Sequence, residues 1–464
     1  MNRGKRAIAA VAAAMTMVIC FFANSAEAFA AEYWPNNINV QSSAAIVMEL
    51  ETGTILYEKN IHETYYPASI TKIMTALVAL ENSQMDEIVT FSADAVYKNE
   101  GDTSHIARDV GEQMTMEQCL YGMMLESANE CAYAIAEHVG GDVDTFVGMM
   151  NEKAKELGCT DSHFNNTNGL PDTDHYVSAY DMAVISRAAY QNPTFAKIVG
   201  TKSYKIPPTN VHATETPLNN HHCMLHYYKT SKYIYDGCLG GKTGYTDAAR
   251  ATLVTYARRD NMTLVCVVLK TDTILQYTET TALLDYCFDN FGVYRVADQA
   301  QLFAADQEKV LGSVVEDMDL IQVDQNSVVV LPKAAQFSEA SASVVPAKDE
   351  NNPSLVGRVE YTYAGHGVGT ADLMYHQTQG QGFPFHNLPQ EEGGSSIKSI
   401  HIDFVTILVG IAALAAVIFV LLFLRALVQR ILLKRRRKRN AMKRRKNTGY
   451  RTIRRSRNRN RRRR

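Results

Sequence analysis

The sequence lacks a regular arrangement of cysteines. Eight cysteines are scattered among 464 residues, and seven of them follow the N-terminal apolar run that contains Cys20. An odd number without short, regular spacing is not typical of a disulfide framework or of a cysteine metal site. The chain is long enough for two or three domains with a large core, so we expect most of these thiols to be buried and free. Cys223 and Cys238 are the one pair worth testing for a disulfide.

Acidic side chains are absent from the C-terminal segment. Residues 434–464 contain 19 Lys and Arg and no acid, whereas residues 32–400 contain 23 basic and 47 acidic side chains, so the formal net charge of −2 conceals a strong segregation. Arginine-rich segments can bind nucleic acid through its phosphates. A cytoplasmic tail attracted to anionic lipid explains the segment more simply, so we expect membrane lipid rather than nucleic acid as its partner.

Long apolar runs are also scarce, and the first lies at the N-terminus. Three basic residues precede an apolar stretch over residues 7–23, and small residues follow it. This order is typical of a secretory signal peptide, which we expect over residues 1–30. An uncleaved anchor helix is the alternative, although the run is short for a membrane span.

The second apolar run lies near the C-terminus. Residues 404–424 carry no charge and have only Thr406 as a polar side chain, which predicts a transmembrane helix within residues 402–424. The basic tail at 425–464 would then lie in the cytoplasm, and the preceding chain would lie outside a cell membrane that it crosses once. A Gly-, Gln-, Pro- and Ser-rich segment at 379–401 is expected to be the linker to the membrane.

Motifs for metals and nucleotides are missing as well. His222 and His226 have a spacing that could suit zinc, but no third ligand with metal spacing stands nearby. The glycines around Gly365 and Gly369 are not followed by a helix pattern, which excludes a phosphate-binding loop there. We therefore expect neither a metal nor an organic cofactor.

Hydrophobic periodicity predicts an α+β arrangement for the first large region. Strands are expected at both ends of this region and helices between them, which favours one antiparallel sheet flanked by a helical region. A turn at Glu51-Thr52-Gly53 joins the first two strands. The expected strands are 44–50, 54–58, 88–91, 201–206, 251–257 and 263–269, and the expected helices are 67–81, 116–125, 130–139, 143–157, one opening at Ser178, and 278–291.

The chain changes character after Tyr294. Short β-rich runs at 310–315, 327–331, 356–363 and 370–375 predict a small all-β domain over residues 294–378.

A serine and a lysine stand one helical turn apart at the start of the helix expected over residues 67–81. Ser69 and Lys72 project from the same face, so an unprotonated lysine amine could take the proton of the serine hydroxyl. The pair alone is not specific, because Ser395 and Lys398 repeat the spacing in the expected linker. An amphipathic helix with polar residues in its first turn is the structural alternative.

Two further short motifs raise the specificity. Ser127-Ala128-Asn129 lies between two expected helices, and Lys242-Thr243-Gly244 begins or lines a strand. Each is weak alone, since Ser456-Arg457-Asn458 repeats the first pattern in the basic tail. Their order, with one motif at a helix start, one between helices and one on a strand, makes the combination far more specific.

With these motifs the chain resembles the penicillin-recognising serine enzymes, most closely the low-molecular-mass penicillin-binding proteins that are D-alanyl-D-alanine carboxypeptidases. Segments 164–170, 175–182 and 242–247 also look like segments of that family, and the resemblance covers roughly residues 40–292. It implies a penicillin-binding, β-lactamase-like transpeptidase fold with a helical subdomain, over residues 31–293. The run at 356–373 is similar to the β domain that follows in such carboxypeptidases.

The resemblance implies catalytic roles for three residues. Ser69 would attack the carbonyl between the two D-alanines of a peptidoglycan pentapeptide, release the last one and leave an acyl-enzyme for water to resolve. Lys72 would be the base, which requires its pKa to fall through burial and through a neighbouring charge such as that of Lys242. Ser127 would pass a proton to the leaving amine, and β-lactams would inhibit covalently.

The resemblance also implies a substrate-binding set. Asn129 would hydrogen-bond the substrate peptide, Lys242 and Thr243 would hold the terminal carboxylate, and Gly244 would keep the strand clear for the substrate backbone. The N–H groups of Ser69 and Tyr245 would form the oxyanion hole.

The sequence departs from the family near residues 273–277, where relatives often carry an arginine that helps to bind the carboxylate. Arg250 is a candidate substitute. A β-lactam-hydrolysing enzyme is the enzymatic alternative, for which Glu215 and Asn219 offer a deacylating pair at the wrong spacing. A non-catalytic wall-binding or sensor module is the alternative from another class.

Three polar residues have purely structural explanations. Ser127 could serve as a cap for the helix that follows it. Ser178 and Asp181 are expected to form a capping box, in which each side chain bonds to the backbone of the other residue.

Overall fold

The computed structural model describes residues 33–99, 103–299, 321–347, 352 and 354–375. The expected signal peptide, the strand at 310–315, the linker, the transmembrane helix and the basic tail lie outside these residues. Among the residues described, no helix is long and apolar enough to cross a membrane.

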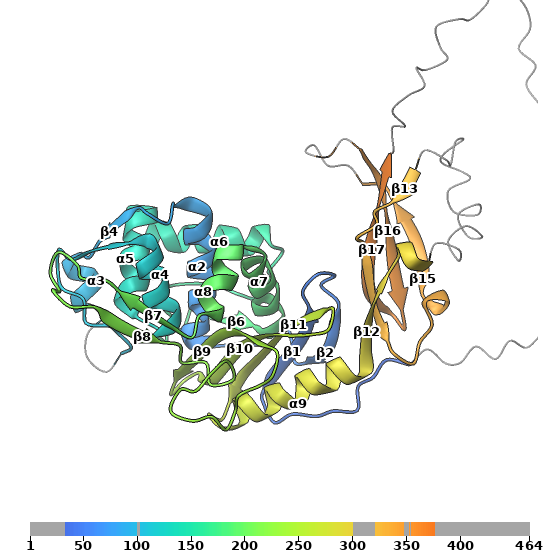
Figure 1. The fold of residues 1–464 in the computed structure, drawn as a ribbon, viewed down its shortest axis with the longest axis horizontal. Coiled ribbons are helices and arrows are strands. Elements are labelled where there is room, and N and C mark those ends of the chain that lie inside the picture. The colour runs from blue at the N-terminus through green and yellow to red at the C-terminus, as the bar shows by residue number, and fades with distance from the viewer. Residues whose placement is uncertain (1–32, 100–102, 300–320, 348–351, 353, 376–464) are drawn as a thin grey trace, which may run out of the picture. The chain divides into compact units, whose positions relative to one another are not determined.

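A five-stranded antiparallel sheet organises the described part of the first region (Figure 1). Its order is β2-β1-β11-β10-β9, so a strand near the start of the chain pairs with one more than two hundred residues later. Ala44 lies opposite Leu269, and Val47 opposite Cys266. The expectation of one sheet built from both ends of the region is confirmed. The bounds are β1 Ala44–Glu49, β2 Ile55–Lys59, β9 Cys238–Thr246, β10 Arg250–Arg259 and β11 Met262–Thr271.

Both faces of this sheet are buried. Ile46 and Val267 belong to the core beneath one face, whereas Val47 and Cys266 belong to the core beneath the other. The alternation follows from the period of two in a strand, which sends successive side chains to opposite faces. Strands covered on both sides read as nearly continuous apolar runs, as the sequence of β1 does.

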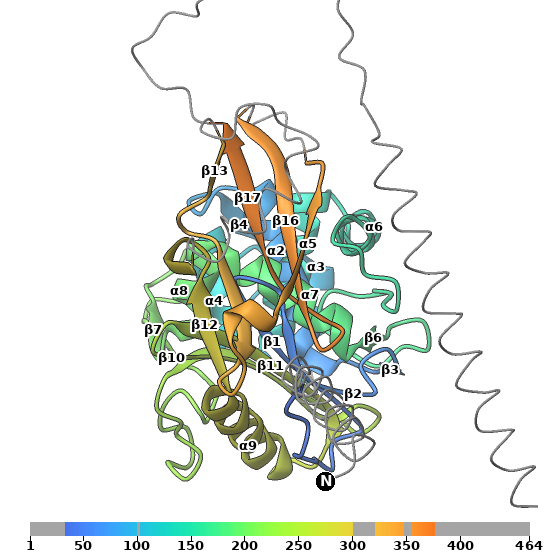
Figure 2. The same ribbon diagram turned by 90° about the vertical axis from the view of Figure 1, so that its right-hand side faces the viewer.

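Helices cover both faces, and Figures 1 and 2 show the helical region on one side of the sheet and α9 on the other. Helix α9 packs against β10 and β11, whereas α7 packs on β1 and β11. The bounds are η1 Ala68–Thr71 (a 3-10 turn), α2 Lys72–Asn82, α3 Ala93–Tyr97, α4 Met116–Leu125, α5 Asn129–Gly140, α6 Val143–Glu156, α7 Ala179–Gln191, α8 Pro193–Gly200 and α9 Leu275–Asn290.

The cap of α7 differs in part from the expected capping box. Ser178 Oγ does accept a hydrogen bond from the N–H of Asp181, as predicted. The reciprocal bond is replaced, because Ser178 N–H donates to Ser162 Oγ and the Asp181 carboxylate accepts from Asp161 N–H. The loop at 161–162 therefore hydrogen-bonds both the N–H of Ser178 and the carboxylate of Asp181. The Asp181 bond joins that loop to α7.

Three two-stranded sheets join the loops to the helical region. The pair β3–β6 places the loop at 159–177 beside the chain that enters η1, and β7–β8 forms a hairpin after α8. The bounds are β3 Thr64–Tyr65, β4 Ile88–Thr90, β5 Gln113–Thr115, β6 Val177–Ser178, β7 Ser203–Ile206 and β8 Thr216–Asn219.

A second antiparallel sheet follows α9 in the described residues. Strand β16 alternates buried and exposed side chains, so only one of its faces packs on the core around Val329, Val359 and Leu373. The domain limits at 293 and 378 stay predictions. The bounds are β12 Phe291–Arg295, β13 Ile321–Val323, β14 Val328–Pro332, β15 Ser341–Val345, β16 Leu355–Tyr363 and β17 His366–Tyr375.

The seven cysteines after the N-terminal run are free thiols, and five of them are buried. Cys223 and Cys238 form no disulfide, and the Cys223 thiol instead donates to the carbonyl oxygen of Tyr228 at 3.4 Å.

The buried face of α2 gives a direct test of this packing. Ile73 is fully buried, whereas Ile88 is 51% exposed. Ile73→Ala should lower the free energy of unfolding by about 2–5 kcal/mol, because it removes buried methyl groups and leaves a cavity. Ile88→Ala, the control, should cost less than about 0.5 kcal/mol. Chemical denaturation measures both, and equal losses would contradict the burial of this helix face.

Candidate active site

The structure brings the three predicted motifs together. Ser69 lies in η1, Lys72 begins α2, Ser127 and Asn129 flank the start of α5, and Lys242 lies on β9. Lys72 Nζ contacts Ser69 Oγ at 3.1 Å and Asn129 Oδ1 at 2.7 Å. Lys242 Nζ donates to Ser127 Oγ at 3.2 Å. Motifs that lie up to 173 residues apart in the sequence thus share one site.

Lys72 has three oxygen neighbours and no carboxylate partner among its hydrogen bonds. Besides Ser69 Oγ and Asn129 Oδ1, the backbone carbonyl of Asn168 lies 2.8 Å from Nζ. Two of these oxygens are a carbonyl and an amide oxygen, which can only accept. A neutral amine has two N–H groups and one lone pair. If the N–H groups serve Asn129 and Asn168, the lone pair is left for the hydroxyl proton of Ser69.

Burial lowers the pKa of both lysines. Burial, followed by the nearby charge of Lys242, holds the pKa of the fully buried Lys72 well below its usual value. These are the two causes that a basic role for Lys72 requires. Burial also lowers the pKa of Lys242, to about 7. Because the two amines repel each other when both are charged, protonation of one favours the neutral form of the other.

Ser127 lies in a strained turn rather than at a helix cap. Its φ is +63°, in the left-handed region that is costly for a residue with a side chain. The cap position of α5 is Ala128, and no side chain caps that helix. The structural alternative in which Ser127 caps α5 is therefore wrong. The hydroxyl contacts Lys242 across the site instead.

Gly244 has a structural reason in addition to the predicted one, which stays a prediction. A Cβ at this position would lie 2.8 Å from the backbone nitrogen of Ser69 and 2.4 Å from Thr252 Oγ1. The glycine is thus needed for β9 to lie against the backbone of the nucleophile turn. Thr252 Oγ1 also donates to the carbonyl oxygen of Pro67 at 2.8 Å, which holds the same turn from β10.

A buried brace behind Ser69 was missed by sequence reasoning. Ala68 has a φ of +51°, and the Thr71 hydroxyl donates to the Ala68 carbonyl at 2.9 Å. His175 Nδ1 accepts from Asn165 N–H, so its Nε2–H donates to Thr71 Oγ1 at 2.9 Å. Burial lowers the pKa of His175 to about 4, so the ring stays neutral. The resemblance of segment 175–182 to the family was the only signal for it.

The other predicted substrate-binding residues lie along β9, and the candidate carboxylate ligand Arg250 begins the next strand, β10. Thr243 is half-buried, and Tyr245 is 50% exposed. Arg250 pairs with Asp272 at 3.1 Å, directly before the segment 273–277 that lacks the family's arginine. Its guanidinium therefore lies beside that segment, although no contact joins it to Ser69 or Lys242.

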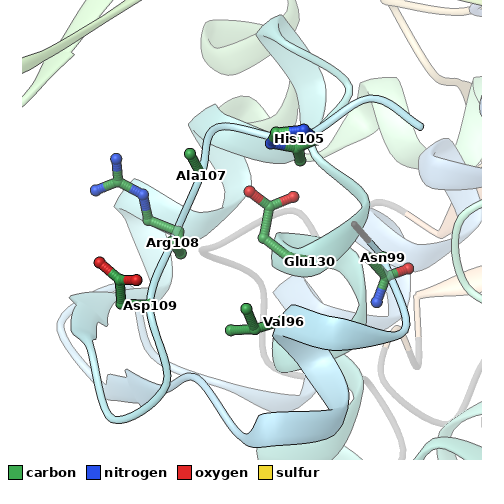
Figure 3. Close-up of a pocket in the computed structure, with 7 residues that line it drawn as sticks. All are labelled: Val96, Asn99, His105, Ala107, Arg108, Asp109 and Glu130. Atoms are coloured by element: carbon green, nitrogen blue, oxygen red, sulfur yellow. The ribbon is translucent and has the colours of Figure 1, made fainter. Parts of the chain in front are cut away.

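A polar cavity of about 400 Å³ flanks the site without containing its nucleophile (Figure 3). Figure 3 shows the Glu130 carboxylate between Arg108 and His105. Glu130 follows Asn129 in α5 and accepts from Ile106 N–H at 2.6 Å, while Asn129 N–H donates to the Ser104 carbonyl. The cavity wall therefore supports the backbone of Asn129. Its lining consists of Val96, Asn99, His105, Ala107, Arg108, Asp109 and Glu130.

Candidate metal ligands are already used in protein contacts. Asp109, Glu112 and His212 could together face one ion. Glu112 Oε1, however, pairs with the buried Arg108 at 2.8 Å and contacts His212 Nδ1 at 3.0 Å. A cation there would meet the Arg108 charge, so the cluster fits an ion-pair network better.

The two histidines with zinc-like spacing also face protein oxygens. His222 Nε2 lies 3.0 Å from Thr255 Oγ1, and His226 Nε2 lies 2.9 Å from the Asn220 carbonyl.

Comparison with known proteins identifies relatives for the first region. The profile of the family described as D-alanyl-D-alanine carboxypeptidase matches residues 26–273. The chain is 33% identical over 270 residues to the D-alanyl-D-alanine carboxypeptidase DacF of Bacillus subtilis, covering 57% of this chain and 66% of that protein, just under two thirds. It is 35% identical over 226 residues to DacB2 of Mycobacterium tuberculosis, described likewise, covering 48% of this chain and 73% of that protein.

Solved structures share the fold of the same region. The DD-transpeptidase of Streptomyces K15 superposes with a TM-score of 0.50 at 30% identity, covering 55% of this chain and 100% of that one. A D-alanyl-D-alanine carboxypeptidase from Mycobacterium tuberculosis H37Rv also has a TM-score of 0.50 and 30% identity, covering 56% of this chain and 95% of that one. The predicted transpeptidase fold, an antiparallel sheet with flanking helices, is confirmed.

The brace behind Ser69 predicts a pH dependence of stability. His175 takes up a proton below about pH 6.5 in the unfolded chain, but only near pH 4 in the folded one. The unfolded state therefore binds more protons between these values, so stability falls as pH falls from 6.5 towards 4, by at most about 1.4 kcal/mol per pH unit for this residue. Urea unfolding of wild type and His175→Gln at several pH values measures it. The variant should have a shallower slope, and identical slopes would contradict the assignment.

Proposed function

The chain belongs to the D-alanyl-D-alanine carboxypeptidase family, and we propose that it acts as a serine-type carboxypeptidase with Ser69 as its nucleophile. The substrate is a peptidoglycan stem peptide that ends in two D-alanines. One observation carries the assignment: the buried Lys72 amine has two obligatory acceptors and one hydroxyl, that of Ser69, at 3.1 Å. A neutral amine with that geometry is placed to receive the hydroxyl proton.

In the acylation step, Ser69 Oγ bonds to the carbonyl carbon between the two D-alanines while its proton passes to Lys72. The backbone N–H groups of Ser69 and Tyr245 stabilise the oxyanion. The C–N bond then breaks as the proton that Lys72 took from Ser69 passes through Ser127 to the leaving nitrogen, so that D-alanine departs with a neutral amine. Water next attacks the ester on Ser69, releasing the shortened peptide and restoring the hydroxyl.

Substrate binding uses the strand beside the nucleophile. Strand β9 is the last in the order of its sheet, so an extended peptide can lie along it. Lys242 and Thr243 bind the terminal carboxylate, and Asn129 bonds the peptide. A bound carboxylate keeps Lys242 charged, and this charge keeps Lys72 neutral. Substrate binding thereby favours the reactive form of the base.

The same serine would take a β-lactam as a slow substrate and be trapped as a stable acyl-enzyme. The alternative of an enzyme specialised in β-lactam hydrolysis gains no support from Glu215, which forms an exposed ion pair with Lys205 at 2.9 Å. Nothing in the site favours a non-catalytic wall-binding module, because its buried lysines would then have no purpose that apolar side chains could not serve better.

We propose a location for the enzyme from its sequence. The signal peptide, the span at 404–424 and the basic tail support a single-pass cell-membrane protein whose catalytic region faces the cell wall. The tail would bind anionic lipid on the cytoplasmic side.

Substitution of the nucleophile tests this function. Ser69→Ala should abolish labelling of the full-length protein by a fluorescent penicillin and lower D-alanine release from a defined pentapeptide by at least about 10³-fold. Ser395→Ala is the matched control, because Ser395 and Lys398 repeat the spacing in the expected linker. Equal labelling of Ser69→Ala and wild type would refute the assignment.

Titration of Lys242 gives a second test. Its pKa of about 7 in the free enzyme means that the charge awaiting the carboxylate is lost as pH rises. The kcat/KM for D-alanine release should therefore fall above about pH 7, up to tenfold per pH unit, because this ratio reports ionisation of the free enzyme. The kcat should fall only at higher pH, since the bound carboxylate raises this pKa. Coincident falls in kcat and kcat/KM would contradict the role of Lys242.

A further inference from the structure

The carboxylate of Glu126, directly before the strained Ser127, connects the end of α4 with the chain around Asn219 and His221. Glu126 is the C-cap residue of α4, and its Oε2 accepts a hydrogen bond from His221 Nε2–H at 2.7 Å. Its Oε1 accepts from the N–H of Asn219 at 2.6 Å. The backbone is joined as well, because His221 N–H donates to the carbonyl oxygen of Leu125 at 3.3 Å. Both oxygens of one side chain thus hold the segment that follows β8.

That segment is fixed to the sheet. His222 Nε2 contacts Thr255 Oγ1 on β10 at 3.0 Å, and Asn220 Nδ2 donates to the Val199 and Thr201 carbonyls at 3.0 Å each. Thr255 lies opposite Gly241, the neighbour of Lys242 on β9. A chain of contacts therefore leads from the sheet through residues 219–222 to Glu126 and the turn at Ser127. Ser127 in turn contacts Lys242, which lies on the same sheet.

The turn needs such support. Ser127 has a left-handed backbone, and strain of this kind persists only where the surroundings over-determine the conformation. The local chain supplies little, since Glu126 N–H and Ala128 N–H share one acceptor, the Gly122 carbonyl, at 3.2 Å each. The Glu126 side chain joins the α4–α5 turn to a distant segment, in addition to the backbone bond from His221 to Leu125 and the contact of Lys242 with Ser127.

The surroundings of the pair keep Glu126 ionised. Burial alone would raise the pKa of Glu126, but the hydrogen bonds from His221 and Asn219 and the charges of His221 and Lys229 outweigh it and lower the pKa. The ring of Tyr228 stacks on His221 with the centroids 4.3 Å apart. Cys223 and His226 lie near the segment but bond to backbone carbonyls.

We propose that Glu126 and His221 form a positioning pair that holds Ser127 at the distance from Lys242 needed for proton delivery to the leaving D-alanine. The proposal rests on the proposed function, because it gives Ser127 its importance. Neither side chain hydrogen-bonds to Ser69, Lys72 or Lys242, so the pair acts through Ser127. A displacement of about 1 Å at such a group can cost about 10²-fold in rate.

A double-mutant cycle tests the pair in the full-length protein. Glu126→Ala should lower the kcat for D-alanine release about 10- to 100-fold with KM within about twofold, and Glu126→Gln, which still accepts from Asn219, should lose less. In a Ser127→Ala background, Glu126→Ala should cause no further loss, because the residue through which it acts is gone. His221→Phe keeps a ring on Tyr228 but has no N–H for Glu126, so it provides a second route if Glu126→Ala fails to fold.

A matched pair elsewhere controls for stability. His138 Nε2 and Glu87 Oε2 are also 2.7 Å apart, but lie away from the three motifs. Glu87→Ala should leave kcat unchanged. The proposal is overturned by a wild-type kcat in Glu126→Ala and His221→Phe, by the same fold loss with and without Ser127, or by an equal loss in Glu87→Ala. Failure of the proposed function would show itself separately, as absent D-alanine release by the wild type.

Discussion

The burial of Lys72 beside a second lysine is the constraint on which the rest of the site depends. A buried ammonium without a carboxylate partner is costly, so the folded chain favours the neutral amine. Neutrality fixes the hydrogen-bond pattern, since the amine then has one lone pair and two fixed acceptors on Asn129 and Asn168. The same burial that would be a liability in an ordinary core creates a base directed at Ser69. The charge of Lys242 lowers the pKa of Lys72 further, by repulsion of the ammonium form.

Two strained residues mark where the backbone is forced to serve this arrangement. Ala68 precedes the nucleophile and Ser127 faces it, and both have left-handed backbones that are usual only for glycine. Each turn is tied to a distant segment through a neighbouring side chain: Thr71, which bonds the Ala68 carbonyl, contacts His175, and Glu126, next to Ser127, accepts from Asn219. The turns that present the reacting hydroxyls thus hold two strained residues, although left-handed backbones also occur at the sheet itself, at Arg250 on β10 and Lys270 on β11.

Sequence patterns predicted the elements well where the signal is local. Helix α4 has the predicted bounds, and Ser69 and Lys72 share a face because the period of a helix requires it. The brace at His175 was missed because its partner Thr71 lies 104 residues away. Of the two bonds predicted for the capping box at Ser178, the one to the Ser178 N–H was wrong for a similar reason. The competing partner, Ser162, lies in a loop outside the helix sequence.

The sequence by itself determined most of the longer strands and helices, although not α3 or α8, together with the three polar motifs and the family to which they point, because periodicity and motif spacing are properties of neighbouring residues. Only the tertiary structure decided the ionisation of Lys72 and Lys242, the reason for Gly244, the strain at Ser127 and the support given by Glu126 and His221. These depend on burial and on contacts between segments far apart in the chain, which exist only once the sheet and the helical region have packed together.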